Sequence, residues 1–158
     1  MIVSTTAIGF YLSLVLQRRM MLFNQLALLT ENISTAIRYN SNDIYNLLSN
    51  ECKYTEIPFM KKVLDNLEQG NSVEYSWKNA VDLLPASYGL SKQDKTTIKQ
   101  FGCKLGVTDV EGQSNHCEYF KSVFSMLEKQ LKEDYIKRSR VYRSLGFFSG
   151  LALSIMIF

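Results

Sequence analysis

The chain has 158 residues, which suits one domain, and its 18 basic and 15 acidic side chains leave a net charge of +3. One histidine and three cysteines, with no C-x-x-C pair, disfavour a hydrolase, a structural zinc module and a disulfide framework, and free thiols fit a reducing compartment. Two prolines and an apolar fraction of 46% favour long helices over disorder.

Charged residues are absent from both ends of the chain, residues 1–17 and 144–158. A group of basic residues, called a basic collar below, stands on the inner side of each uncharged end. The two collars are Arg18 and Arg19, and Lys137, Arg138, Arg140 and Arg143. Residues 20–136 between them hold 12 basic against 15 acidic residues, a net charge of −3. Nucleic-acid binding is disfavoured, because it requires a basic face on the domain itself.

The first uncharged segment, residues 1–17, predicts an N-terminal transmembrane helix. Its apolar run would measure about 22 Å as a helix, shorter than the roughly 30 Å of a hydrocarbon core. A secretory signal peptide is disfavoured, because the basic residues follow the apolar run and no small-residue cleavage site comes after it. Buried core helices of a soluble protein are the alternative for both ends of the chain.

The first helix is expected to continue to about Tyr39, because apolar residues recur at steps of three and four without an intervening Gly or Pro. Ser41 is expected to cap a short helix that ends at Leu48, and a polar linker is expected over residues 50–56. Three further helices are predicted before residue 106. Their boundary signals are Pro58 and Gly70, Ser72 and Pro85, and the capping pair Ser91 and Asp94.

Gly102 and Gly106 lack the strand that a dinucleotide-binding loop requires, so they predict close helix packing and a helix stop. Either Thr108 or Asp109 is expected to cap the helix that follows. Three residues could be considered as metal ligands, Cys103, His116 and Cys117, but their spacing matches no common metal site. Packed thiols and a polar histidine ring are expected instead.

The last helix is predicted to run directly into the second uncharged segment, residues 144–158, which predicts a C-terminal transmembrane helix. Gly146 and Gly150 form a small-xxx-small pair, a pattern that lets two helices approach closely in lipid. Their expected partner is Ala7 and Gly9 of the first segment, or another copy of the chain. The basic collar before this segment predicts a membrane anchor, or a site for anionic lipid or an acidic partner.

These elements predict an all-α fold, a membrane-anchored helical bundle with two long antiparallel terminal helices and about four shorter helices between them in the chain. Lys and Arg stay on the cytoplasmic side of a membrane. The collars therefore place residues 18–143 in the cytoplasm as one helical domain between transmembrane segments at 1–17 and 144–158. The residues offer no catalytic set, no cofactor site and no metal site.

Several strings resemble the stage III sporulation protein AB family over essentially the whole chain. Gly9-Phe10 near the start and Trp77 after Gly70 lie where that family has them. The more specific strings are Phe101-Gly102-x-x-Leu105-Gly106-x-x-Asp109-x-x-x-Gln113-x-x-His116 and Tyr142-Arg143-Ser144-Leu145-Gly146.

The resemblance implies a non-enzymatic part in endospore formation, in a complex that crosses the envelope between mother cell and forespore. The family is similar to the inner-membrane platform proteins of type II secretion systems, which sit beside a cytoplasmic ATPase. The resemblance thus implies protein partners that include such an ATPase, a place in the mother-cell membrane, and no nucleic acid. The alternative function is a soluble all-helical regulator or chaperone-like binder whose apolar ends pair with a partner.

Overall fold

The computed structural model describes residues 2–39 and 44–157, and the side chains of residues 11–39, 45–53 and 55–137. These residues form six α-helices and one short 3-10 helix, and no strand occurs among them. The elements in chain order are α1 (Ile2–Tyr39), α2 (Ile44–Tyr54), α3 (Met60–Glu68), α4 (Val73–Asp82), η1 (Ala86–Tyr88), α5 (Lys92–Cys103) and α6 (Val110–Ile157).

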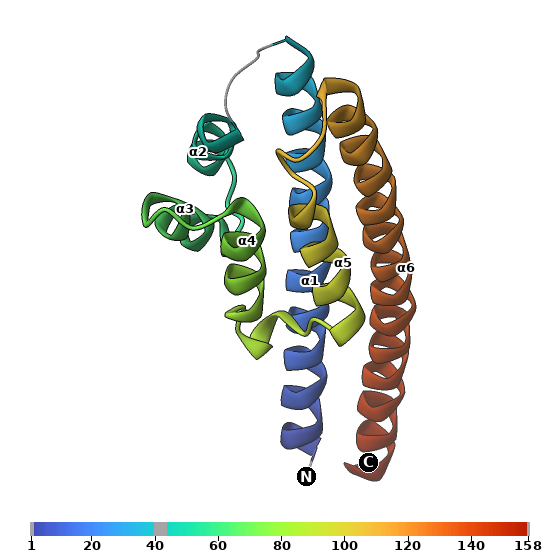
Figure 1. The fold of residues 1–158 in the computed structure, drawn as a ribbon. Helices are drawn as coiled ribbons and strands as arrows, with labels where there is room; N and C mark the ends of the chain where they lie inside the picture. Colours follow the sequence, from blue (N-terminus) through green and yellow to red (C-terminus); the bar gives the residue numbers. More distant parts are fainter. Residues whose placement is uncertain (1, 40–43, 158) are drawn as a thin grey trace.

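The two longest helices, α1 and α6, lie side by side and antiparallel, so both termini lie at one end of the molecule (Figure 1). Helices α2, α3 and α4 lie on the side of α1 away from α6, and α5 contacts both long helices (Figure 1). The predicted all-α fold is confirmed, with two long terminal helices and four shorter helices between them in the chain. The structure does not show membrane anchoring.

The core lies where the predicted apolar stripes of α1 and α6 meet the shorter helices. Phe23 of α1 packs on Phe124 of α6 with ring centroids 6.1 Å apart, and Phe101 of α5 packs on Phe124 at 5.9 Å. The largest fully buried side chains include Trp77, Phe23, Phe101, Phe124, Leu22, Leu26, Leu29 and Ile33. Burial of these side chains is the main force that holds the shorter helices against the long pair.

The capping signals at Ser72 and Ser91 form as the sequence predicts, and the cap expected at Ser41 lies outside the described residues. The Ser72 hydroxyl accepts a hydrogen bond from the Tyr75 backbone N–H at 3.3 Å. Ser91 and Asp94 form both hydrogen bonds of a capping box at the start of α5. These caps satisfy backbone N–H groups that have no partner within the helix.

The second helix is longer than predicted. It continues through residues 50–54, where a polar linker was expected. Leu48 is fully buried, and Cys52, one helical turn later, packs against the core. The Asn32 side-chain amide of α1 also donates a hydrogen bond to Glu51 at 2.8 Å. Residues 50–54 are polar and have little tendency to form a helix alone. These tertiary contacts stabilise the helical conformation there.

Candidate functional site

Arg19, placed in the first basic collar by sequence, lies instead against the start of α5. Its guanidinium Nη2 lies 2.8 Å from the Asp94 carboxylate, and Asp94 is only 2% exposed. The other Asp94 function is the capping box with Ser91. Arg19 therefore binds within the fold, and its buried Nε has no partner in the described part of the chain.

The remaining collar residues fall into two groups. Arg18 and Lys137 are exposed on α1 and α6. Arg138, Arg140 and Arg143 lie in α6, and their side chains lie outside the described residues. Arg18 and Lys137 are thus the collar side chains that the structure leaves accessible to solvent.

The connection between α5 and α6 turns at Gly106, whose φ is +78°. That conformation favours glycine because it brings a Cβ close to the backbone. The Asp109 carboxylate then accepts a hydrogen bond from the Gly112 backbone N–H at 3.1 Å. Thr108 has a different contact: its hydroxyl accepts a hydrogen bond from the Gln113 amide at 3.2 Å. Asp109 therefore caps α6, and Thr108 holds Gln113.

Asp109→Ala should lower the free energy of unfolding by about 0.5–2 kcal/mol, because it leaves the Gly112 N–H without its cap. Thr108→Ala should cost less, since the Gln113 amide keeps its second acceptor, the Lys104 carbonyl at 2.9 Å. Urea denaturation of the two variants measures the difference. A larger loss from Thr108→Ala would reverse the assignment of the cap.

Gly102 lies inside α5 and does not end a helix. A Cβ built at Gly102 would lie 2.0 Å from Cγ of Trp77, so the absence of a side chain allows α4 and α5 to pack closely. The Trp77 indole N–H donates a 2.8 Å hydrogen bond to the Ile98 carbonyl one turn earlier. Gly102 is therefore the residue that admits the indole to the core.

A seam of small polar side chains joins α1 and α6 at the end away from the termini. The hydroxyls of buried Ser34 and Ser114 lie 3.1 Å apart, and Arg38 donates from Nε to the Ser114 hydroxyl at 2.7 Å. The Arg38 guanidinium also pairs with Glu118. Here small side chains and hydrogen bonds replace the aromatic contacts found near Phe23.

An open hollow of about 580 Å³ lies over this seam. Its lining consists of Arg38, Asp109, Val110, Glu111, Ser114 and Asn115. Arg38 is the basic residue of this lining and pairs with Glu118, whereas Asp109 and Glu111 are acidic. The surface around the hollow thus has an excess of carboxylates.

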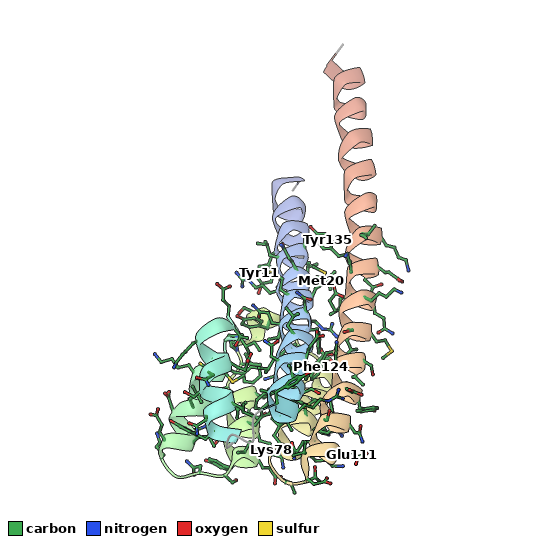
Figure 2. The ribbon with its side chains drawn as sticks, turned by 90° about the horizontal axis from the view of Figure 1, so that it is seen from above. Tyr11, Met20, Lys78, Glu111, Phe124 and Tyr135 are labelled. Atoms are coloured by element: carbon green, nitrogen blue, oxygen red, sulfur yellow. The ribbon has the colours of Figure 1, made fainter. Side chains whose placement is uncertain are left out.

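Exposed apolar side chains lie at the same end of the helix pair as the hollow. Tyr39, at the end of α1, is 83% exposed, and Val110, at the start of α6, is 54% exposed. Figure 2 places Glu111 at the end of the pair opposite Tyr11 and Tyr135. Carboxylates beside accessible apolar groups are a suitable surface for a partner that offers basic and apolar side chains.

Cys117 and His116 are packed inside the fold. Burial, with a smaller contribution from Glu118, raises the pKa of the Cys117 thiol to about 12. The His116 ring stacks on Phe101, and its Nε2 lies 2.9 Å from the Phe101 carbonyl oxygen. Cys103 and Cys117 are free thiols. Across the residues that the structure describes, no group of three or more His, Cys, Asp or Glu side chains is arranged to hold a metal ion.

Within the described part of the chain, no helix combines the length and the apolar character needed to cross a membrane. The transmembrane segments at 1–17 and 144–158 remain predictions. Gly9 lies in α1, and Gly146 and Gly150 lie in α6. The packing around these three glycines lies outside the described residues.

The sequence did not predict the long-range polar contacts that Arg19 and Arg38 make within the chain. Both involve partners more than 70 residues away, Asp94 and Ser114. A signal was available for the second contact, because Ser34 interrupts the apolar stripe of α1 on its core side and is buried. Polar residues on a buried stripe indicate hydrogen-bond partners on a facing element.

A family model described as Stage III sporulation protein AB matches residues 1–158 of the chain. The Stage III sporulation protein AB of Bacillus subtilis (strain 168) is 23% identical over 160 aligned residues, which cover 99% of this chain and 94% of that protein. No solved structure matches the chain.

Proposed function

The chain belongs to the stage III sporulation protein AB family, which gives it a role in sporulation, and on that premise we propose that it is a non-enzymatic platform. In this proposal the termini meet the mother-cell membrane, and the opposite end of the helix pair reaches into the cytoplasm. The protein joins the partners of a complex between mother cell and forespore, including a cytoplasmic ATPase.

The observation that carries the proposal is the acidic hollow at the end of α1 and α6 farthest from the termini. A rigid pair of long helices, held by Phe23 on Phe124 and by the Arg38 network, presents this hollow away from any membrane that the termini enter. A docking surface at that end transmits force from a partner along both helices. Carboxylates there select a basic partner surface and speed its association.

Glu111→Lys tests this docking surface. It should weaken capture of the ATPase by about tenfold, because it places a positive charge opposite the basic groups of the partner. Chemical crosslinking of the full-length chain to the ATPase in sporulating cells, followed by spore counts, measures the effect.

Glu56→Lys is the matched control. Glu56 is exposed on the connection between α2 and α3, so this substitution changes the net charge by the same amount far from the hollow. The Glu111 variant should reduce crosslinking and spore yield while the Glu56 variant leaves both unchanged. Equal effects of the two variants would reject the hollow as the docking surface.

The soluble regulator remains the alternative to a platform. Carbonate extraction of membranes separates the two functions, because it removes peripheral proteins and leaves inserted ones. Retention of the chain in the carbonate-washed membranes supports the platform. Complete release into the supernatant overturns it.

A further inference from the structure

The contact between Phe23 and Phe124 determines which parts of the two long helices lie at the same level. Twelve residues from Phe23 toward the termini is Tyr11, and twelve residues from Phe124 in the same direction is Ile136. Helices rise equally per residue, so Tyr11 and Ile136 lie at one level, as do Leu12 and Tyr135. Figure 2 shows Tyr11 on α1 and Tyr135 on α6 on the same side of Phe124, toward the end of the pair that carries the termini. These four residues are called the tyrosine band.

The tyrosine band is accessible and has a distinctive composition. Tyr11 is 57% exposed, Leu12 45% and Ile136 48%, although all three have large apolar side chains. Lys137 follows directly and is exposed. Tyr with aliphatic and Lys side chains is the composition found where membrane proteins pass from water into lipid, because the rings and the Lys stem contact apolar groups while their polar ends stay in water.

The same levels exclude a symmetric insertion of the two uncharged ends. The part of the first uncharged segment from Leu12 to Leu16 stands beside residues 131–135 of α6, which include three exposed charged side chains, Lys132, Glu133 and Asp134. A bilayer that covered all of residues 2–16 would also cover those charges. Each charge would cost about 2.5–3.5 kcal/mol at the centre of a bilayer.

The folded domain also occupies part of the first uncharged segment. Leu16 packs against the core, and Gly89 lies so close to Val15 that a Cβ there would stand 2.3 Å from a Val15 methyl group. Beyond the tyrosine band α1 has only residues 2–10, about 14 Å of helix, which is half of a hydrocarbon core. In α6, residues 138–143 follow the band and still include Arg138, Arg140 and Arg143, and the uncharged residues 144–157 after them form about 21 Å of helix.

We propose that α6 alone carries the chain deep into the bilayer, and that α1 goes no deeper than the near leaflet. The tyrosine band and residues 138–143, which carry three arginines, lie at the level of the lipid headgroups, between water and the hydrocarbon core. This inference rests on the membrane role proposed above. It makes the two ends of the chain unequal: α6 is the anchor, and α1 supports its exit from the lipid.

Depth-dependent quenching by brominated lipids tests the proposal with the full-length chain. The unmodified chain has one tryptophan, Trp77, which is fully buried in the domain and serves as a background that lipid does not reach. Single tryptophans are added in separate variants, in vesicles of phosphatidylethanolamine and phosphatidylglycerol brominated near the headgroup or at the chain end. The variants are Tyr11→Trp, Ile8→Trp, Ile2→Trp, Ile136→Trp and, as a control on the exposed face of α6 nearer the domain, Met126→Trp.

We expect equal loss of emission from Tyr11→Trp and Ile136→Trp with the shallow bromines, and no loss from Met126→Trp. Quenching by the chain-end bromines should increase steadily from residue 11 through residue 8 to residue 2. A membrane-spanning α1 would instead give maximal deep quenching near residue 8 and a decline at residue 2, and would overturn the proposal.

Vesicle binding without quenching at residues 11 and 136 would also overturn it. Failure of the unmodified chain to sediment with the vesicles is a separate result. It would overturn the proposed membrane role itself.

Discussion

Gly102→Ala should lower the free energy of unfolding by about 3 kcal/mol, at the upper end of the usual cost of overpacking a core. The new Cβ would lie 2.0 Å from Cγ and 2.2 Å from Cδ1 of Trp77. The indole cannot move away cheaply, because its N–H is bonded to the Ile98 carbonyl at 2.8 Å. Phe59 and Phe101 also pack on it edge to face, with centroids 5.2 and 5.4 Å away.

Gly70→Ala is the matched control for this prediction. Gly70 has a φ of +83°, but no atom lies within 4 Å of a Cβ built there. Its replacement should therefore cost only about 1 kcal/mol, from backbone strain alone. Urea denaturation followed by the fluorescence of Trp77 measures both variants. Equal losses would show that the indole adapts and that the close approach of α4 to α5 does not limit stability.

Asp94→Ala should lower the free energy of unfolding by about 2–3 kcal/mol, because one carboxylate has two functions. It accepts the Ser91 backbone N–H in the capping box at 2.7 Å, and loss of a cap costs about 1 kcal/mol. It also pairs with Arg19, whose side chain is only 25% exposed. Removal of one partner leaves a partly buried charge without compensation, although contact with solvent reduces the cost.

A double-mutant cycle separates the two functions of Asp94. Asp94→Asn keeps an acceptor for the Ser91 N–H and removes the charge, and Arg19→Met removes the other partner of the pair. We expect the double variant to be more stable than the sum of the two single losses implies, by about 1 kcal/mol. Additive losses would assign the whole effect of Asp94→Ala to the cap.

Short-range patterns predicted most of the helix boundaries. The apolar stripe correctly ended the first helix at Tyr39, and the hydroxyls of Ser72 and Ser91 marked the next helix starts. The pattern worked because a helical face repeats every three to four residues and a cap acts on the backbone of the next turn. The predicted end of the second helix, at Leu48, was wrong, because the last turn of α2 depends on contacts with α1.

The candidate site was less predictable than the fold, because its contacts are long-range. The sequence assigned Arg19 to a membrane collar by its position after an apolar run, and the structure pairs it with Asp94, 75 residues away. The acidic hollow depends on the juxtaposition of Arg38 with the start of α6, which no local pattern specifies. Electrostatic pairing across a core is determined by which helix faces meet.

The sequence by itself determined that this chain is helical, where most of its helices begin and end, and that its charges avoid both ends. Each of these properties depends on residues within one or two turns of each other. Only the tertiary structure decided the level at which α1 and α6 pair, because Phe23 and Phe124 are brought together by packing across the whole core. That level places the exposed charges of residues 132–134 beside the first apolar segment, and it makes two ends that look alike in sequence physically unequal.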